Sequence, residues 1–209
     1  FQAAITGAYY GTLIEKAEQE GRITDELYDE NLEVETWWDL GMNDQTVIWF
    51  VQRHKSEIRL IDYYEASGEG LDHYAKVINN KPYDFSTHVA PFDIKVRELG
   101  AYGKSRLESA LELGISFTVA PKLSIEDGIE AVRKAIPNCY FDKNKCQVGI
   151  EALKAYQKRW DERNQCFRNK PLHNFASHSA DAFRTGIVGS GIEATDWKKT
   201  ISVNTNYII

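Results

Sequence analysis

Three aspartates stand at the ends of apolar segments, where an uncompensated carboxylate is costly. Asp39 follows two tryptophans in WWDLG, Asp93 closes HVAPFD, and Asp181 lies in SHSADAFRTG near the start of a helical pattern. Taken singly, each aspartate is explained equally well as a turn or helix cap. Three such carboxylates, far apart in sequence, fit a hard divalent cation better than three separate caps, because oxygen ligands suit Mg²⁺ or Mn²⁺.

The chemistry that such a site supports is phosphodiester hydrolysis. Two divalent ions about 4 Å apart activate a water molecule and stabilise the leaving oxygen. His178 precedes Asp181 by three residues, which places both on one helix face, so it is a candidate to orient a ligand or to transfer a proton. A histidine on the helix surface is the simpler interpretation of His178. Asp44 lies close enough to Asp39 in sequence to support the ligands through hydrogen bonds.

The charge of the chain is unevenly distributed. The formal net charge of −6 argues against a protein that coats nucleic acid non-specifically. Residues 15–35, however, hold nine acids and two bases, a net charge of −7, which leaves +1 for the rest of the chain. Residues 142–170 hold eight bases against four acids, interleaved with three aromatic residues.

This basic, aromatic segment favours contact with a phosphate backbone, although an ordinary solvated helix and hairpin explains it as simply. The candidate DNA contacts are Lys143, Lys145, Lys154, Lys158, Arg159, Arg163 and Arg168.

Other catalytic patterns are absent from the sequence. It contains no GxxxxGK[ST] phosphate loop and no GxSxG nucleophile motif. The three cysteines form no CxxC pair, and their spacing is too long for a compact zinc site with His173. An odd number of cysteines favours a reducing, intracellular compartment over a disulfide framework.

The length of 209 residues favours one domain, and 43% hydrophobic with 27% charged residues excludes a globally disordered chain. No apolar run approaches the roughly 20 residues of a membrane span, and no signal-peptide pattern opens the chain. Because the chain starts with Phe1 rather than Met, we expect it to be a piece of a longer polypeptide.

Hydrophobic periodicity predicts the elements that position the candidate residues. Helices are expected over 3–20, 71–78, 105–113, from 124 onward, 145–157 and 177–186, and strands over 32–40, 46–54, 57–66, 86–90, 115–119 and 138–141. The segment 158–170 is interpreted as a loop or hairpin. This α/β alternation predicts a mixed sheet with helices on its faces. Ligands gather at the carboxyl ends of strands in such sheets, so we expect Asp39 and Asp93 to converge there.

The motifs WWDLGMNDQT, HVAPFD and HSADAFR, in this order after the opening FQAAITGAYYGTLIEKAEQEGRI, resemble the C-terminal nuclease domain of the large terminase subunit of tailed bacteriophages. The resemblance runs from about residue 1 to 186. It implies an RNase H-like fold, a central mixed sheet flanked by helices with an acidic cluster that binds two ions of Mg²⁺ or Mn²⁺. It also implies an endonuclease that cuts concatemeric double-stranded viral DNA.

Carried over by motif, Asp39, Asp93 and Asp181 are the implied metal ligands, with His178 as a further catalytic residue. Asp44 matches an extra acid of some members. The resemblance implies a single nuclease domain over 1–190, in which 1–31 form a leader helix and an acidic connector to an ATPase domain outside these residues. Residues 191–209 would be a C-terminal tail.

The implied partners are viral double-stranded DNA, the ATPase domain of the same polypeptide, the portal and the small terminase subunit. The expected place of action is the host cell cytoplasm, with no secretion and no membrane contact.

Three other interpretations stay open at the level of sequence. One is a different RNase H-like nuclease, such as a junction resolvase or a transposase. A second is a sugar-kinase or actin-like ATPase, because DLGMNDQT also resembles a phosphate loop of that fold, which needs a second matching half. The third is a non-catalytic binding module, in which the aspartates are caps and the acidic stretch 15–35 docks a protein partner.

Overall fold

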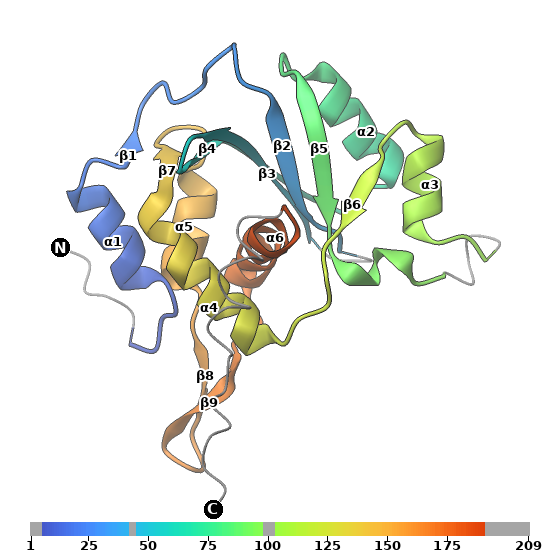
Figure 1. Cartoon of the computed structure of the whole chain (residues 1–209). Helices are drawn as coiled ribbons and strands as arrows, with labels where there is room; N and C mark the ends of the chain where they lie inside the picture. Colours follow the sequence, from blue (N-terminus) through green and yellow to red (C-terminus); the bar gives the residue numbers. More distant parts are fainter. Residues whose placement is uncertain (1–5, 42–44, 98–102, 191–209) are drawn as a thin grey trace, which may run out of the picture.

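The computed structural model describes residues 6–41, 45–97 and 103–190 and places a seven-stranded mixed sheet at the centre of the molecule (Figure 1). The strands lie in the order β1-β7-β4-β3-β2-β5-β6. Their bounds are β1 Ile23–Thr24, β2 Val34–Asp39, β3 Gln45–His54, β4 Glu57–Ser67, β5 Phe85–Ala90, β6 Phe117–Val119 and β7 Cys139–Asp142. The predicted fold class, a mixed α/β sheet flanked by helices, is confirmed.

The helices cover both faces of the sheet. They are α1 Gly11–Gln19, α2 Leu71–Asn80, α3 Arg106–Glu112, α4 Ile125–Ala135, α5 Gln147–Ala155 and α6 Phe175–Gly189, with short 3₁₀ turns η1 Phe92–Lys95 and η3 Ile136–Asn138. One core lies under α1, α4, α5 and α6, and a second lies under α2 and α3. No helix that the structure describes has the length and apolar character needed to cross a membrane.

The two adjacent tryptophans of β2 anchor the two cores. Successive side chains of a strand point to opposite faces, so Trp37 enters one core and Trp38 the other, and both are fully buried. The Trp37 ring packs edge-on against Phe183 of α6, with centroids 5.5 Å apart. Asp39, two residues after Trp37, therefore faces α6.

Strand register brings the ends of β2 and β5 to one edge of the sheet. β3 and β4 form the predicted antiparallel hairpin around the turn at Lys55. β2 pairs antiparallel with β3 and parallel with β5, where Trp37 lies opposite Val89. The carboxyl ends of β2 and β5 are therefore neighbours, which is the arrangement expected for Asp39 and Asp93.

The helix predicted over 3–20 is wrong in its first part, because α1 starts at Gly11. Ala8 forms a bridge with Gln157, and the Tyr9 N–H donates to the Tyr156 carbonyl at 2.8 Å. These contacts hold residues 6–10 in a turn and a bridge, outside the helix. Residues 3–5 lie outside the described part of the chain, as does the predicted tail 191–209.

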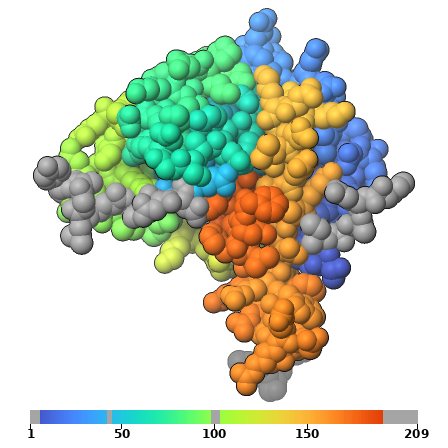
Figure 2. Space-filling model, turned by 180° about the vertical axis from the view of Figure 1, so that it is seen from behind, coloured from blue at the N-terminus to red at the C-terminus, as the bar shows by residue number. Residues whose placement is uncertain are grey.

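A two-stranded hairpin, β8 Lys158–Asp161 and β9 Cys166–Pro171, stands apart from the main sheet. It projects from the body of the molecule, as the orange lobe of Figure 2 shows. Trp160 and Phe167 pack edge-on at 4.9 Å between its strands. We call residues 158–171 the basic hairpin; of the loop or hairpin expected over 158–170, the structure selects the hairpin.

Candidate active site

Helix α6 lies so close to β2 that the two elements place their polar side chains together. Small residues on the buried side of α6 make this approach possible: Ala176, Ser179, Ala180, Ala182 and Gly186. A Cβ atom added to Gly186 would lie 1.8 Å from the Trp37 ring. The glycine is therefore required by the contact between this helix and the sheet.

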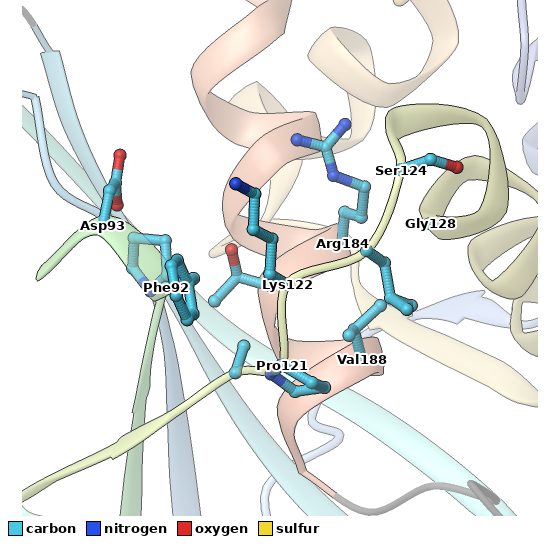
Figure 3. Close-up of a pocket in the computed structure, with 12 residues that line it drawn as sticks. Phe92, Asp93, Pro121, Lys122, Ser124, Gly128, Arg184 and Val188 are labelled. Carbon is cyan, nitrogen blue, oxygen red and sulfur yellow. The ribbon is translucent and has the colours of Figure 1, made fainter. Parts of the chain in front are cut away.

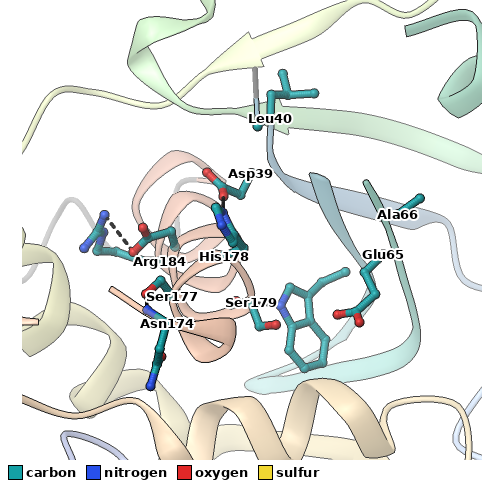
Figure 4. Close-up of polar contacts among 12 residues, drawn as sticks. Asp39, Leu40, Glu65, Ala66, Asn174, Ser177, His178, Ser179 and Arg184 are labelled. Carbon is teal, nitrogen blue, oxygen red and sulfur yellow. Dashed lines mark hydrogen bonds and ion pairs between the residues drawn. The ribbon is translucent and has the colours of Figure 1, made fainter. Parts of the chain in front are cut away.

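Asp39 and His178 are in direct contact (Figure 4). Asp39 is the last residue of β2, and the His178 Nδ1–H donates to its Oδ2 at 2.8 Å. The two side chains are 21% and 13% exposed, so the pair is largely shielded from water. The sequence placed His178 beside Asp181 on one helix face; the structure shows that it also reaches across to the end of β2.

Asp181 lies one helical turn beyond His178 in an environment that disfavours its charge. Burial, and then the negative charge of Asp39, raise the pKa of the Asp181 carboxyl to about 6, although Arg184, His178 and His173 act in the opposite direction. The Arg184 guanidinium lies 3.1 Å from the Asp181 carboxylate. A half-buried carboxylate with so high a pKa is one whose charge is only partly compensated by the protein.

Asp93 lies in η1, directly after β5, and its side chain is exposed. It lines a cavity together with Arg184, the partner of Asp181 (Figure 3). The structure thus joins Asp39 to His178, places Asp181 within the electrostatic influence of both, and places Asp93 at the neighbouring strand end. Within residues 6–41, 45–97 and 103–190, no three His, Cys, Asp or Glu side chains are grouped as a metal site. A site shared by all three aspartates stays a prediction.

The donor set nevertheless suits a hard divalent cation. Asp39 and Asp181 supply carboxylate oxygens, the ligands that Mg²⁺ and Mn²⁺ prefer. Their mutual repulsion contributes to the raised pKa of Asp181, and a cation between them would remove that repulsion. The thiols of Cys139 and Cys146 are buried in the core, away from these acids.

The chain matches no protein-family profile and no curated protein sequence. Its structure is similar to the ADP-bound large terminase of a thermophilic bacteriophage, with a TM-score of 0.62 over 84% of this chain and 44% of that one, at 16% identity. The P22 large terminase nuclease domain matches with a TM-score of 0.57 over 80% of this chain and 87% of that one, at 16% identity. The SPP1 large terminase nuclease domain, with bound Mn, gives 0.53 over 73% and 84%, at 14% identity.

The chain has the fold of a large terminase nuclease domain. This is the RNase H-like fold that the resemblance implies, and it confirms that prediction. The chain spans less than half the length of the ADP-bound large terminase, but most of the P22 nuclease domain.

On this terminase nuclease fold, the seven bases predicted to contact DNA do not share one surface. Lys143 and Lys145 precede α5 and the basic hairpin follows it, so they lie at opposite ends of this helix (Figure 1). Two of the seven form ion pairs among the described residues: Lys154 pairs with Glu18 at 2.9 Å, and Arg168 with Asp161 at 2.7 Å. Of the seven, Lys158, Arg159, Arg163 and Arg168 lie on the basic hairpin. DNA binding by any of the seven stays a prediction.

Asp44 lies outside the described residues, so the structure says nothing of its predicted supporting role. Two residues near the candidate site were not identified from the sequence. Arg184 follows Asp181 at the i+3 spacing of a helical ion pair, a signal present in DAFR. Glu65 of β4 lies opposite Val47, which also pairs with Asp39, so both acids lie at one level of the sheet.

The Glu65 carboxylate accepts a 2.5 Å hydrogen bond from the Tyr63 hydroxyl, and Figure 4 shows Glu65 beside the strand that carries it. An acid near the end of a strand was the pattern that identified Asp39, and the same pattern in YYEAS identifies Glu65.

Proposed function

We propose that this chain is the nuclease domain of a phage packaging terminase, a divalent-metal-dependent endonuclease that cuts concatemeric double-stranded DNA. The observation that carries the proposal is the contact of Asp39 with His178, one helical turn from a half-buried Asp181 of raised pKa, on the fold of terminase nucleases. Carboxylates in this state support metal-dependent hydrolysis better than they support helix caps.

Asp39, Asp93 and Asp181 would hold two ions of Mg²⁺ or Mn²⁺. When bound, the ions supply a water molecule of lowered pKa and stabilise the leaving oxygen of the phosphodiester. His178 fixes one oxygen of Asp39 through its Nδ1–H, and the other oxygen would be the one to hold an ion. Arg184 holds the Asp181 carboxylate in place and favours its charged form.

The comparisons support metal use and a larger assembly. The SPP1 domain was solved with bound Mn and the G20c nuclease with bound cobalt, and this chain spans 44% of the ADP-bound large terminase. We therefore propose an ATPase domain in the same polypeptide, the portal and the small terminase subunit as partners, and the host cytoplasm as the place of action.

Plasmid nicking tests this function. The 209-residue chain should convert supercoiled plasmid to nicked and linear forms with Mn²⁺ or Mg²⁺ and not with EDTA. Asp39→Asn, Asp93→Asn and Asp181→Asn should each lower the rate at least about 100-fold. Asp72→Asn on the exposed face of α2 is the matched control and should leave the rate unchanged.

Equal nicking by the three variants and the control would contradict the proposed site. The substrate distinguishes the remaining alternatives, because a junction resolvase or a transposase should prefer branched or transposon-end DNA to plain duplex. Cleavage of plain duplex at an equal or higher rate supports the terminase assignment.

A further inference from the structure

We propose that the cavity beside Asp93 is a subsite for one nucleotide of a single DNA strand. In this subsite Phe92 stacks on the base, and Lys95, Lys122 and Arg184 contact the backbone phosphates. The inference deepens the proposed function, since it rests on DNA as the substrate of the neighbouring aspartates. We call this space the Phe92 cavity.

The Phe92 cavity lies between η1, the 120–124 segment and α6 (Figure 3). Its volume is about 250 Å³, which is close to the lower end of small-ligand sites, roughly 300–1,000 Å³. Pro91 and Pro121 form rigid walls, and the Ala120 N–H donates to the Ala90 carbonyl at 2.9 Å, which closes the end behind them. A space of this size has room for one nucleotide and excludes an intact base pair.

The exposed ring of Phe92 indicates that the cavity binds a nucleobase. Its side chain is 46% exposed, although a ring of this size usually enters the core. The ammonium nitrogens of Lys95 and Lys122 lie 5.7 and 5.8 Å from the ring centroid. An aromatic ring flanked by cations is the arrangement with which proteins bind single strands, because the ring stacks on any base and the cations hold the phosphates.

The two lysines are available for a ligand's charge. No carboxylate in the described part of the chain forms an ion pair with Lys95 or Lys122. Figure 3 shows the head groups of Lys122 and Arg184 on the same side of the cavity as the Asp93 carboxylate. Positive charge thus gathers at the mouth of the cavity, next to a proposed metal ligand.

Helix α4 leaves room for the Arg184 side chain at Gly128. A Cβ atom on Gly128 would lie 2.5 Å from the Arg184 Cδ, so only glycine lets this side chain pass. Glycine weakens a helix relative to alanine, and Gly128 is placed in the interior of α4. The loss of helix stability at Gly128 is explained if function requires Arg184 in this position.

Arg184 connects the Phe92 cavity to the proposed catalytic aspartates. Its guanidinium pairs with Asp181, and it also lines a second cavity of about 270 Å³ with Asp181, Tyr156, Lys170 and His173. A strand that passes over Arg184 therefore crosses from Phe92 to Asp181. This path places the nucleotide in the Phe92 cavity beside the phosphate to be cleaved.

DNA binding by fluorescence anisotropy, in EDTA so that no cleavage occurs, tests the subsite. The probes are a labelled oligo-dT strand of about 12 nucleotides, within the usual range of single-strand site sizes, and a duplex of the same length. Phe92→Ala should weaken single-strand binding about fivefold or more, and Phe92→Trp should restore it. Lys122→Ala should lower the slope of log affinity against log salt by about 0.7.

Matched controls separate this effect from general changes of the surface. Leu111→Ala removes an exposed apolar side chain of α3, and Lys134→Ala removes a cation at the far end of α4. Both should bind the strand within twofold of the unchanged chain. Thermal unfolding of every variant checks that it is folded.

The subsite is wrong if Phe92→Ala binds the strand as tightly as Leu111→Ala does, or if the chain binds only the duplex. The subsite and the proposed nuclease function can each fail without the other. Metal-dependent plasmid nicking combined with Phe92-independent strand binding would overturn the subsite alone. Phe92-dependent strand binding without any metal-dependent nicking would overturn the nuclease alone and leave the subsite supported.

Discussion

At the scale of single residues, Asp181 is held in a state that is unfavourable for stability. Its half-buried carboxyl loses part of its hydration and lies near the charge of Asp39, and Arg184 forms an ion pair with it at 3.1 Å. Catalytic groups are often kept in such states because function requires them there. The cost should therefore be measurable as stability gained when the charge is removed.

We expect Asp181→Asn to stabilise the metal-free chain above pH 6. The folded-state pKa of about 6 lies above the ordinary aspartate value of 3.8, so the native state binds the extra proton and stability falls as pH rises through this window. Asparagine does not ionise, so the variant avoids that fall. The gain should be well below the roughly 3 kcal/mol of the full pKa shift at pH 8, because solvent screens a side chain that is 34% exposed, and it should vanish below about pH 4.

Urea unfolding in EDTA at pH 4, 6 and 8 measures this difference, with Asp72→Asn as the exposed control. A variant that is destabilised equally at all three pH values would contradict the electrostatic account of Asp181.

The sequence identifies some of the candidate site residues and not others. Asp39 and Asp93 could be selected because strand ends are visible in the apolar pattern. The bond from His178 to Asp39 could not, since it joins residues 139 positions apart and depends on how closely α6 approaches β2. In the sequence, Arg184 and Asp181 were one of many acid–base pairs at i+3 spacing, so nothing distinguished Arg184.

At the scale of elements, the packing of α6 on β2 determines where the acids lie. The helix carries His178 and Asp181, and its distance from the sheet is set by small residues, above all Gly186 against Trp37. The same helix packs its Phe183 ring between Trp37 and Trp49, at 5.5 and 5.6 Å. A shift of α6 would therefore move two candidate catalytic groups at once.

We expect Gly186→Ala to destabilise the chain by about 1–3 kcal/mol or more, because the new methyl group overlaps the Trp37 ring and forces the helix outward. Plasmid nicking should fall more than stability alone explains when it is measured well below the melting temperature. Val148→Ala on the exposed side of α5 is the control for a small change in a helix. Full nicking activity in Gly186→Ala would show that the helix position does not set the site.

Elements with local signals were the ones predicted correctly. The β3–β4 hairpin follows from two apolar strands and a short polar turn, and Ser124 caps α4 as its sequence indicates. The prediction of a helix was wrong for residues 6–10, because their apolar spacing suits a helix, whereas contacts with residues 156–158 hold them in a turn and a bridge. Strand β1, only two residues long, depends on a parallel partner 118 positions away and has no local signal.

At the scale of the whole molecule, the fold separates the basic residues that lie together in the sequence. The basic hairpin projects away from the sheet, while Lys143 and Lys145 lie at the other end of α5 (Figures 1 and 2). Lysines and arginines bind DNA according to where they lie in space, so the seven candidates should not contribute equally.

We expect the hairpin to carry the DNA affinity of the isolated chain. The triple variant of Lys158, Arg159 and Arg163 to alanine should weaken duplex binding and lower the salt slope by about 0.9 for each phosphate that is no longer neutralised. The double variant of Lys143 and Lys145 to alanine should bind within twofold of the unchanged chain. Anisotropy titrations from low to moderate salt measure both, and the reverse pattern would place the DNA on the opposite end of α5.

Anomalous diffraction from crystals of the chain soaked in Mn²⁺ tests whether the three aspartates bind metal. We expect Mn²⁺ peaks bound to carboxylate oxygens of Asp39, Asp93 and Asp181, at about 2.0–2.2 Å, with η1 drawn towards α6. We also expect the peaks to be absent from Asp39→Asn crystals. Saturating Mn²⁺ with no peak at these three residues, or with peaks that Asp39→Asn leaves unchanged, would contradict the proposed metal site.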